Sequence, residues 1–171
     1  MNAKTFDERS AKTGNEGEYS MIIERVTSLK QNQIIRLIED SKTEGHRFGQ
    51  IFMDEYSGNN RFDRPGESLY VAREEDMVIG ICGLNIDPYL DQIDVGRVRR
   101  FYVLSKCRGN GVGKQLLLTI VDEAKQHFKK LTLYTENPIA EKLYISMGFS
   151  RVEGIHNVSH ILNFEEQLIR D

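Results

Sequence analysis

The sequence predicts an α/β fold of the α+β kind, with a mixed central sheet that carries helices on both faces. Short runs with strand character and longer runs with helical spacing follow one another in the order β-α-α-β-β-β-α-β-α-β-β. The run from Met77 to Leu84 is nearly continuous in small and apolar residues. A strand of that kind is expected at the centre of a sheet, covered on both faces.

The length and composition predict a single domain behind a disordered tail. The chain has 171 residues, 39% of them hydrophobic, and its mean hydropathy is −0.47. A chain of this length is most simply one domain. In residues 1–20, Phe6 is the one large apolar side chain among charges and glycines, so a disordered tail is expected there. Residues 21–171 are expected to form the domain.

Bulk properties also bear on location and partners. No apolar stretch is long enough to span a bilayer, and the first residues lack the apolar core of a signal peptide. The two cysteines, Cys82 and Cys107, make neither a disulfide framework nor a metal pattern. A cytoplasmic location is therefore expected. The net charge of −3 argues against general nucleic-acid binding, which favours a basic excess.

The first half of the chain is expected to supply two helices and three strands. Ser28 and Gln31 have capping-box spacing, so a helix is expected to open at Ser28 and to end at Gly45. Periodicity and turn residues give the other elements. These are a strand over 21–23, a helix over 48–56, a loop over 57–66, and strands over 68–73 and 78–84.

The second half is expected to alternate strands and helices before a final pair of strands. A strand ending at Leu104 precedes a helix over 115–128 and a strand over 131–135. Asn137-Pro138 is a strong helix start, with Asn as N-cap and Pro at the first position. Gly148-Phe149 is the matching stop. Strands over 149–152 and 159–164 are expected to complete the sheet.

The segment from Lys106 to Lys114 is the most informative part of the sequence. Gly109, Gly111 and Gly113 alternate just before a helix, so main-chain N–H groups can crowd together and point outward. Such a loop at the positive end of a helix dipole suits a phosphate group. No acidic residue lies between positions 94 and 122. The basic residues of that window are Arg97, Arg99, Arg100, Lys106, Arg108 and Lys114.

Two common phosphate-binding motifs fit this segment poorly. A nucleoside-triphosphate loop would need glycine at Arg108 and a hydroxyl residue at Gln115. A dinucleotide fingerprint would need its third glycine at Lys114. A glycine-rich turn without any ligand is the plain alternative.

A third interpretation explains residues that the first two leave out. Arg108-x-x-Gly111-x-Gly113 after a strand matches the Arg/Gln-x-x-Gly-x-Gly/Ala pyrophosphate loop of acetyltransferases. Further on, the segment from Asn137 to Phe149 resembles that family's second hallmark, Asn…Ala…Tyr…Gly-Phe. The chain therefore resembles the GNAT (Gcn5-related N-acetyltransferase) superfamily over roughly 21–164. This resemblance implies a GNAT-like mixed, mostly antiparallel sheet with helices on both faces.

The resemblance implies acetyl-CoA as the acetyl donor and no metal. The main chain of Phe101, Tyr102 and Val103 would meet the pantetheine arm, and one of those N–H groups would polarise the thioester carbonyl. The pyrophosphate would bind mainly to main-chain N–H groups of the glycine loop, with charge added by Arg108 and Lys114. The residues of this loop are Arg108, Gly109, Asn110, Gly111, Val112, Gly113 and Lys114.

The resemblance also assigns roles to Tyr144 and Asn137. Tyr144 would lie near the sulfur and protonate the departing thiolate, which suits a phenol with a pKa of about 10. The alternative is a core aromatic on an apolar helix face, beside Ala140 and Met147. Asn137 would touch the pantetheine arm; its alternative is an ordinary N-cap, and both roles can hold together.

The general base is where the sequence departs from the family pattern. Several family members carry a glutamate early in the strand before the loop, whereas Arg97 and Arg99 stand there in this chain. Asp94, Glu67 and Glu136 lie near strand ends and are candidates. A chain of water molecules is an equal alternative.

Other charged residues are open between binding and structure. Arg97 and Arg99 are expected on one face of the strand and Arg100 on the other, either as a clamp for a substrate carboxylate or phosphate or in pairs with the chain's acids. Asp54-Glu55 and residues 61–64 lie in the region that usually shapes the acceptor pocket, where solvated loop charges are the alternative. His156 and His160 lie across a turn and a strand, so no metal site is expected.

The favoured function is transfer of an acetyl group from acetyl-CoA to a primary amine, by direct attack in a ternary complex. The acceptor is expected to be a small-molecule or peptide amine, with neither nucleic acid nor a membrane as partner. A non-catalytic acyl-CoA-binding module that senses the cofactor is the first alternative. A phosphate-binding kinase or ATPase is the second, disfavoured by Gln115. The sequence leaves a homodimer open.

Overall fold

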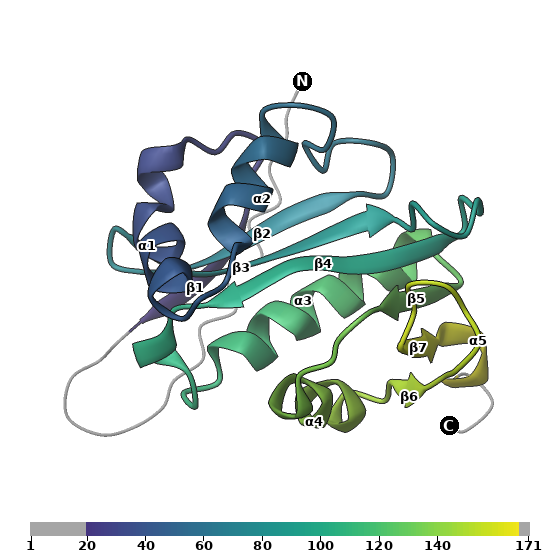
Figure 1. Ribbon diagram of the computed structural model, residues 1–171. Helices are drawn as coiled ribbons and strands as arrows, with labels where there is room; N and C mark the ends of the chain where they lie inside the picture. Colours follow the sequence, from purple (N-terminus) through teal and green to yellow (C-terminus); the bar gives the residue numbers. More distant parts are fainter. Residues whose placement is uncertain (1–19, 168–171) are drawn as a thin grey trace.

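The computed structural model of the protein describes residues 20–167 and contains one seven-stranded sheet with the order β1-β2-β3-β4-β5-β7-β6 (Figure 1). Neighbouring strands are antiparallel except β4 and β5, which run parallel. The prediction of a mixed, mostly antiparallel sheet is confirmed. The strands are β1 (Met21–Arg25), β2 (Ser68–Glu74), β3 (Met77–Ile86), β4 (Val95–Val103), β5 (Lys130–Leu133), β6 (Ser150–Arg151) and β7 (His160–Asn163).

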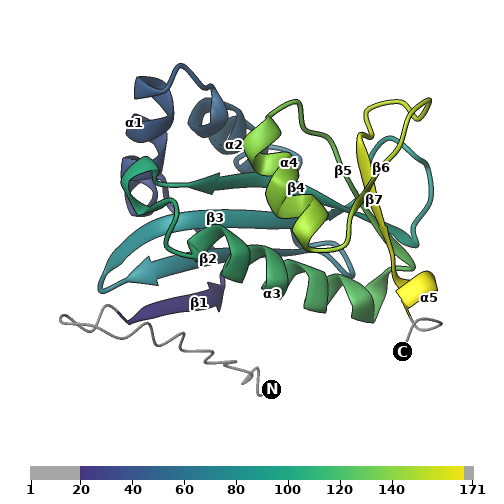
Figure 2. The ribbon, with the colours of Figure 1, turned by 90° about the horizontal axis from the view of Figure 1, so that it is seen from below.

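Helices cover both faces of the sheet, as predicted. Two of them, α1 (Ile35–Thr43) and α2 (Phe48–Tyr56), lie on one face. The other face carries α3 (Val112–His127) and α4 (Pro138–Ser146), which Figure 2 shows in front of the sheet. The remaining short helices are η1 (Gln31–Gln33), η2 (Ser105–Cys107) and α5 (Phe164–Gln167). No helix in the described part of the chain is long and apolar enough to cross a membrane.

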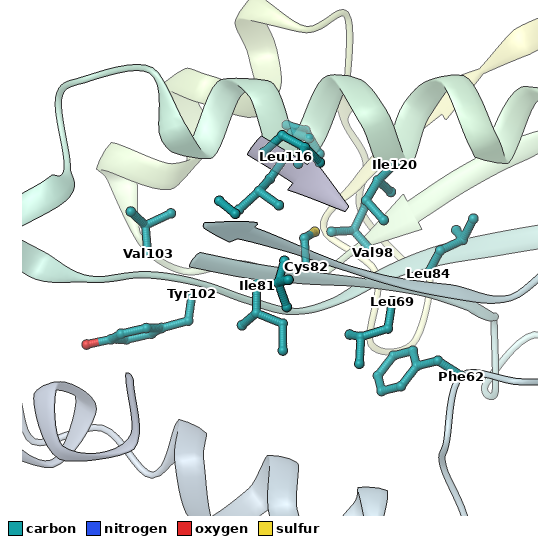
Figure 3. Close-up of a cluster of buried hydrophobic side chains, with 14 of the residues drawn as sticks. Phe62, Leu69, Ile81, Cys82, Leu84, Val98, Tyr102, Val103, Leu116 and Ile120 are labelled. Carbon is teal, nitrogen blue, oxygen red and sulfur yellow. The ribbon is translucent and has the colours of Figure 1, made fainter. Parts of the chain in front are cut away.

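The core lies on both sides of β3, which is buried along its length apart from its two end residues. Leu116 and Ile120 of α3 approach from one side, while Ile81 and Tyr102 face α1 and α2 on the other (Figure 3). Full burial of one large apolar side chain contributes roughly 1.5–3 kcal/mol. The central position predicted for this strand is confirmed.

A glycine on β3 anchors the loop over 57–66. A Cβ at Gly83 would lie 2.3 Å from Cε1 of Phe62, so only glycine leaves room for this ring. Phe62 is itself 4% exposed and belongs to the core. Gly83 pairs with Arg99 on β4. The loop is therefore fixed directly beside the middle of β4.

The ends of α4 follow the predicted local signals. Asn137 caps the helix, because its Oδ1 accepts hydrogen bonds from the main-chain N–H groups of Ile139 at 2.9 Å and Ala140 at 3.4 Å. At the other end Gly148 has φ 98°, and Phe149 N donates to Tyr144 O at 3.1 Å. This is the Schellman pattern, which needs glycine in the left-handed conformation.

Two predicted helix starts are wrong. The helix expected from Ser28 begins at Ile35, after a 3-10 turn whose N-cap is Lys30, and Lys30 N donates to Gln33 Oε1 at 2.8 Å. α3 begins at Val112 rather than Gln115, because left-handed Gly111 already serves as its N-cap. Residues 1–19 of the predicted tail lie outside the described residues.

Candidate active site

β4 and β5 part along their length, which leaves one edge of β4 open. Their pairing ends at Arg97 and Thr132, whereas β4 continues to Val103. No other strand of the described chain pairs with residues 98–103 on this side. An open strand edge can take an extended ligand through main-chain hydrogen bonds.

A β-bulge shapes the same part of β4. Ile81 pairs with Tyr102 and Gly83 with Arg99. Cys82 of β3 therefore lies opposite two residues of β4, Arg100 and Phe101, which form the bulge. Arg100 has φ 55°, in the left-handed region that side chains rarely adopt. The regular alternation of side chains is therefore interrupted here.

Beyond the bulge, the main-chain donors of two residues face the open edge. Leu104 N donates to Ile79 O on β3 at 2.8 Å. Because N–H groups alternate along a strand, the N–H groups of Phe101 and Val103 are directed away from β3. The carbonyl oxygen of Val103 already accepts a hydrogen bond from Arg108 Nε at 3.0 Å.

The glycine loop leaves the N-terminus of α3 without a side-chain cap. Gly109 and Gly111 have φ 82° and 83°, values that glycine adopts without steric cost. The main-chain N–H groups of residues 109–114 donate to no acceptor within the described residues. α4, in contrast, is capped by Asn137. Free N–H groups at the positive end of a helix dipole form an anion-binding site.

Arg108 is paired with α1 instead of projecting freely over this loop. Its Nη1 and Nη2 donate to Glu44 at 2.8 and 2.5 Å. The Tyr102 hydroxyl lies 2.7 Å from the same carboxylate. Hydrogen bonds from Arg108 and Tyr102 lower the pKa of Glu44 below its usual value. Charge on the loop is left to Lys106 and Lys114, which are exposed and form no ion pair with any described residue.

Phe101 connects the glycine loop to α4. A Cβ at Gly113 would lie 3.3 Å from Phe101 Cζ. The Phe101 ring meets the Tyr144 ring edge-on, with centroids 6.3 Å apart. The loop, the open edge of β4 and Tyr144 therefore lie together, although the chain brings them from three separate elements.

Tyr144 is a buried phenol with an unused donor. It is 8% exposed, and its ring also contacts Phe149 with centroids 5.6 Å apart. Its hydroxyl forms no hydrogen bond with any residue of the described chain. Burial, with a smaller effect of Cys82, raises its pKa, so the phenol stays protonated at neutral pH. The ring of Tyr144 therefore packs in the core, while its hydroxyl has no partner among the described residues; its role as proton donor stays a prediction.

Comparison with known proteins identifies the family of this chain. Residues 32–149 match the profile of the Acetyltransferase (GNAT) family. The chain belongs to this family. GNAT proteins use acetyl-CoA, and the described part of this chain has no group of three or more His, Cys, Asp or Glu side chains arranged to hold a metal.

Similar proteins agree with the family assignment. The uncharacterized N-acetyltransferase YjgM of Escherichia coli K12 is 26% identical over 114 residues, 64% of this chain and 67% of YjgM. A solved structure from Exiguobacterium sp. 255-15, assigned as an acetyltransferase, is 28% identical with a TM-score of 0.79 and covers 88% of this chain and 98% of its own. The yncA structure from Salmonella typhimurium, which holds acetyl-CoA, shares the fold at 17% identity, with a TM-score of 0.63 over 85% of this chain and 95% of its own.

The three carboxylates that the sequence suggested as a general base all have partners in the structure. Glu67 is 5% exposed and accepts from Arg64 N at 3.2 Å, Ile86 N at 2.9 Å and the Asn85 amide at 2.9 Å. Asp94 pairs with Lys129 at 3.6 Å, and Glu136 accepts from the Tyr134 hydroxyl. None of them contacts Tyr144 or the bulge.

The arginines of β4 are not arranged as the sequence suggested. Arg97 is structural, because Nη1 lies 3.3 Å from Asp87 Oδ2 and Nη2 lies 2.6 Å from Asn157 O. Arg100 was expected on the face opposite Arg99, and this prediction is wrong: both side chains contact Glu55 of α2. The bulge explains the error, since the extra residue brings Arg100 to the face of Arg99.

Sequence reasoning missed two acidic residues at the C-terminal end of α1 that organise the loop, Asp40 within the helix and Glu44 at its C-cap. Asp40 accepts from Ser105 N at 2.9 Å and from the Ser105 hydroxyl at 2.6 Å, and Glu44 holds Arg108. These contacts fix η2 and the start of the loop against α1. The only local signal is that the two acids are one helical turn apart. Their partners, Ser105 and Arg108, are 65 and 64 residues away in the chain and cannot be predicted from spacing.

Proposed function

We propose that this protein transfers an acetyl group from acetyl-CoA to a primary amine that attacks the thioester directly. The observation that carries the proposal is the start of α3, whose main-chain N–H groups have no side-chain cap, beside the open edge of β4 and the Tyr144 hydroxyl. An anion site, a strand edge and an unused phenol donor are the three features that a diphosphate-bearing thioester needs in one place.

The residues of the chain fit acetyl-CoA along its length. Main-chain N–H groups of residues 109–114 would hold the diphosphate, with charge from Lys114 and less from Arg108, which Glu44 already neutralises. The N–H groups of Phe101 and Val103 would bind the pantetheine arm. Asn137 keeps both roles open, because its Oδ1 caps α4 while its amide N–H groups have no partner among the described residues.

The chemistry requires one bond to form and one to break. The amine nitrogen would attack the carbonyl carbon, and the C–S bond would break. A main-chain N–H at the open edge, from Phe101 or Val103, would stabilise the negative charge that develops on the carbonyl oxygen. The Tyr144 hydroxyl would give its proton to the departing sulfur. Because Asp94, Glu67 and Glu136 are engaged elsewhere, water would take the proton lost by the amine.

A non-catalytic acyl-CoA-binding module is the second candidate. One observation favours it: Glu55 is the carboxylate beside the bulge, and it is a poor base. Burial acts to raise its pKa, but the hydrogen bonds and charges of Arg100 and Arg99 outweigh burial and leave the pKa below its usual value. A binding module would hold acetyl-CoA without consuming it.

A thiol-release assay separates the two candidates. The protein is mixed with acetyl-CoA and a panel of amines that includes amino acids, polyamines and short peptides, and free coenzyme A thiol is followed with time. An acetyltransferase releases thiol faster with at least one amine and yields the acetylated amine by mass spectrometry. Saturable binding of acetyl-CoA with no amine-dependent release would favour the binding module.

The location and domain organisation are part of the same proposal. Both cysteines are free, which supports a reducing compartment such as the cytoplasm. Residues 21–171 are proposed to act as one acetyltransferase domain on a small-molecule or peptide amine.

A further inference from the structure

We infer that Arg99 recognises a carboxylate on the acceptor, so that the acceptor is an amine that also carries a carboxylate group. This inference rests on the proposed acetyl transfer and names the class of its acceptor. Arg99 stands immediately before the bulge residue of β4 and points to the side of α2. Arg99 is therefore close along β4 to Phe101 and Val103, whose main-chain N–H groups at the open edge would bind the thioester.

The hydrogen bonds of Arg99 leave most of its guanidinium unused. Its Nη2 lies 3.2 Å from Glu55 Oε1, and neither Nε nor Nη1 has a partner among the described residues. Arg100 instead makes a two-bond pair with Glu55, and Arg97 is held by Asp87 and Asn157. Among the three arginines of β4, Arg99 therefore has the most nitrogens without a described partner: two, against Nε alone in Arg97 and Nη1 alone in Arg100.

These spare donors are largely covered by protein yet still reach solvent. The Arg99 side chain is 16% exposed, and none of its nitrogens is among the buried atoms that lack a partner. A largely desolvated guanidinium with nitrogens that lack protein acceptors binds a planar, two-oxygen anion well.

The local charge favours a ligand with a single negative charge. Arg97 is balanced by Asp87, while Arg99 and Arg100 share Glu55. The cluster thus keeps one excess positive charge, and Arg99 is close enough to Arg97 for the two charges to repel. A carboxylate neutralises this excess, whereas a phosphate dianion would exceed it.

The position suits an acceptor that arrives from the side of α2. Phe62 fills the space at Gly83 and holds the 57–66 loop beside Arg99, so this side of the bulge is a fixed surface. Arg99 and Phe101 are two residues apart on β4, a separation of at most about 7 Å, the length of two fully extended residues. A small amino acid whose carboxylate rests on Arg99 could therefore bring its amine near the main chain of Phe101.

The test compares amines that differ only in the carboxylate. Glycine, β-alanine and 4-aminobutyrate are each compared with the corresponding carboxamide as acceptors, and kcat/KM is measured by thiol release. The wild-type protein is expected to prefer at least one carboxylate over its carboxamide by on the order of 10- to 100-fold. In Arg99→Gln this ratio should fall towards unity. In Arg99→Lys, which keeps the charge but loses the planar fork, it should be intermediate.

A matched variant and a phosphonate complete the experiment. Arg36→Gln removes one positive charge from α1, where Arg36 contacts Met77, and should leave the ratio at the wild-type value. Equal coenzyme A-induced thermal shifts in all variants show that Arg99→Gln is folded. The inference is overturned if the carboxylate-to-carboxamide ratio of kcat/KM is near unity in the wild type, or if it stays high in Arg99→Gln. In either case thiol release with the carboxamides would still support the proposed acetyl transfer. An Arg99-dependent preference for 2-aminoethylphosphonate over β-alanine overturns the choice of carboxylate. No amine-dependent thiol release from any acceptor overturns the proposed function and the inference with it.

Discussion

Tyr144 combines a packed ring with a free hydroxyl, and these two parts have separable effects. The ring contacts Phe101, Phe149 and His160, so replacing the tyrosine with phenylalanine keeps the packing. Loss of a positioned general acid typically costs on the order of 10²–10⁴ in rate. Tyr144→Phe should therefore lower the single-turnover rate strongly and leave acetyl-CoA affinity nearly unchanged, because the lost interaction forms mainly in the transition state.

Tyr56 supplies a matched control for this variant. Tyr56 is also buried, and its hydroxyl accepts a hydrogen bond from Leu29 N at 3.0 Å on the face of the sheet opposite α4 and Tyr144. Tyr56→Phe leaves a buried N–H without its partner, so it should lower thermal stability and keep the wild-type single-turnover rate. A wild-type rate in Tyr144→Phe would assign Tyr144 to packing alone, and the acid would then be solvent.

Residue by residue, local signals predicted both ends of α4, whereas the equally local capping-box spacing of Ser28 and Gln31 misplaced the start of α1. Asn137 as N-cap and Gly148 as C-terminal stop follow from side-chain and backbone preferences within a few positions. Arg100 was misplaced because the prediction assumed an unbroken alternation, which a bulge interrupts. Glu44 could not be assigned to Arg108 because their contact depends on how α1 packs against the sheet, not on spacing along the chain.

At the scale of elements, the glycine loop is expected to bind through its main chain. Gly111→Val forces a branched side chain into a left-handed conformation and blocks approach to the N–H groups of α3. We expect wild type to show a clear thermal shift with coenzyme A and Gly111→Val to show little.

Gly154, between β6 and β7, provides the matched control for this loop variant. It has φ 78°, and a Cβ there would meet nothing within 4 Å, as at Gly111. Gly154→Val therefore carries the same backbone strain away from the loop, and it should lose stability while keeping the coenzyme A shift. Equal shifts in Gly111→Val and Gly154→Val would remove the loop from the binding site.

The attachment of α2 to β4 should depend on pH. Glu55 binds Arg99 and Arg100, and its pKa is lowered in the folded state. A carboxylate with a lowered folded-state pKa stabilises the protein above its unfolded pKa of about 4.3, and this contribution is lost as pH falls through the folded-state pKa. Glu55→Gln should thus reduce the melting temperature by about 2–4 °C at pH 7, and the difference should disappear in acid.

The difference in melting temperature between wild type and Glu55→Gln isolates the effect of Glu55, because protonation of the other carboxylates in acid destabilises both proteins equally. Thermal melts at pH 7, 5, 4 and 3 give the difference at each pH. A difference that stays constant down to pH 3 would show that Glu55 acts through packing and not through its charge.

At the scale of the whole molecule, the sequence predicted the order of elements and the two helical layers but not the geometry that makes the site. Periodicity reports which side of an element is buried, and this was enough for β3 and α3. The parting of β4 from β5 beyond Arg97 and Thr132 leaves no mark on periodicity, because periodicity reports burial along one element and not where two strands separate. The family resemblance supplied only the expectation that the main chain of residues 101–103 meets the pantetheine arm.

The prediction of a single domain behind a tail also belongs at this scale. The sequence before residue 20 carries little apolar surface to bury, so removing residues 1–19 should leave the melting temperature and the coenzyme A shift unchanged. Limited proteolysis followed by mass spectrometry gives the boundary independently. A truncated protein that melts at a lower temperature would show that this segment contributes to the fold.

The central claim is direct transfer from acetyl-CoA to an amine in one ternary complex. The most direct measurement is a single-turnover experiment with protein in excess over acetyl-CoA, quenched at intervals with and without the best amine of the panel, with the protein, the amine and free thiol all analysed. Direct transfer predicts that thiol and acetylated amine appear together at one rate, that neither forms without amine, and that the protein mass never changes. Thiol release without amine, together with an acetylated protein, would contradict direct attack, and bound acetyl-CoA that no amine consumes would contradict transfer itself.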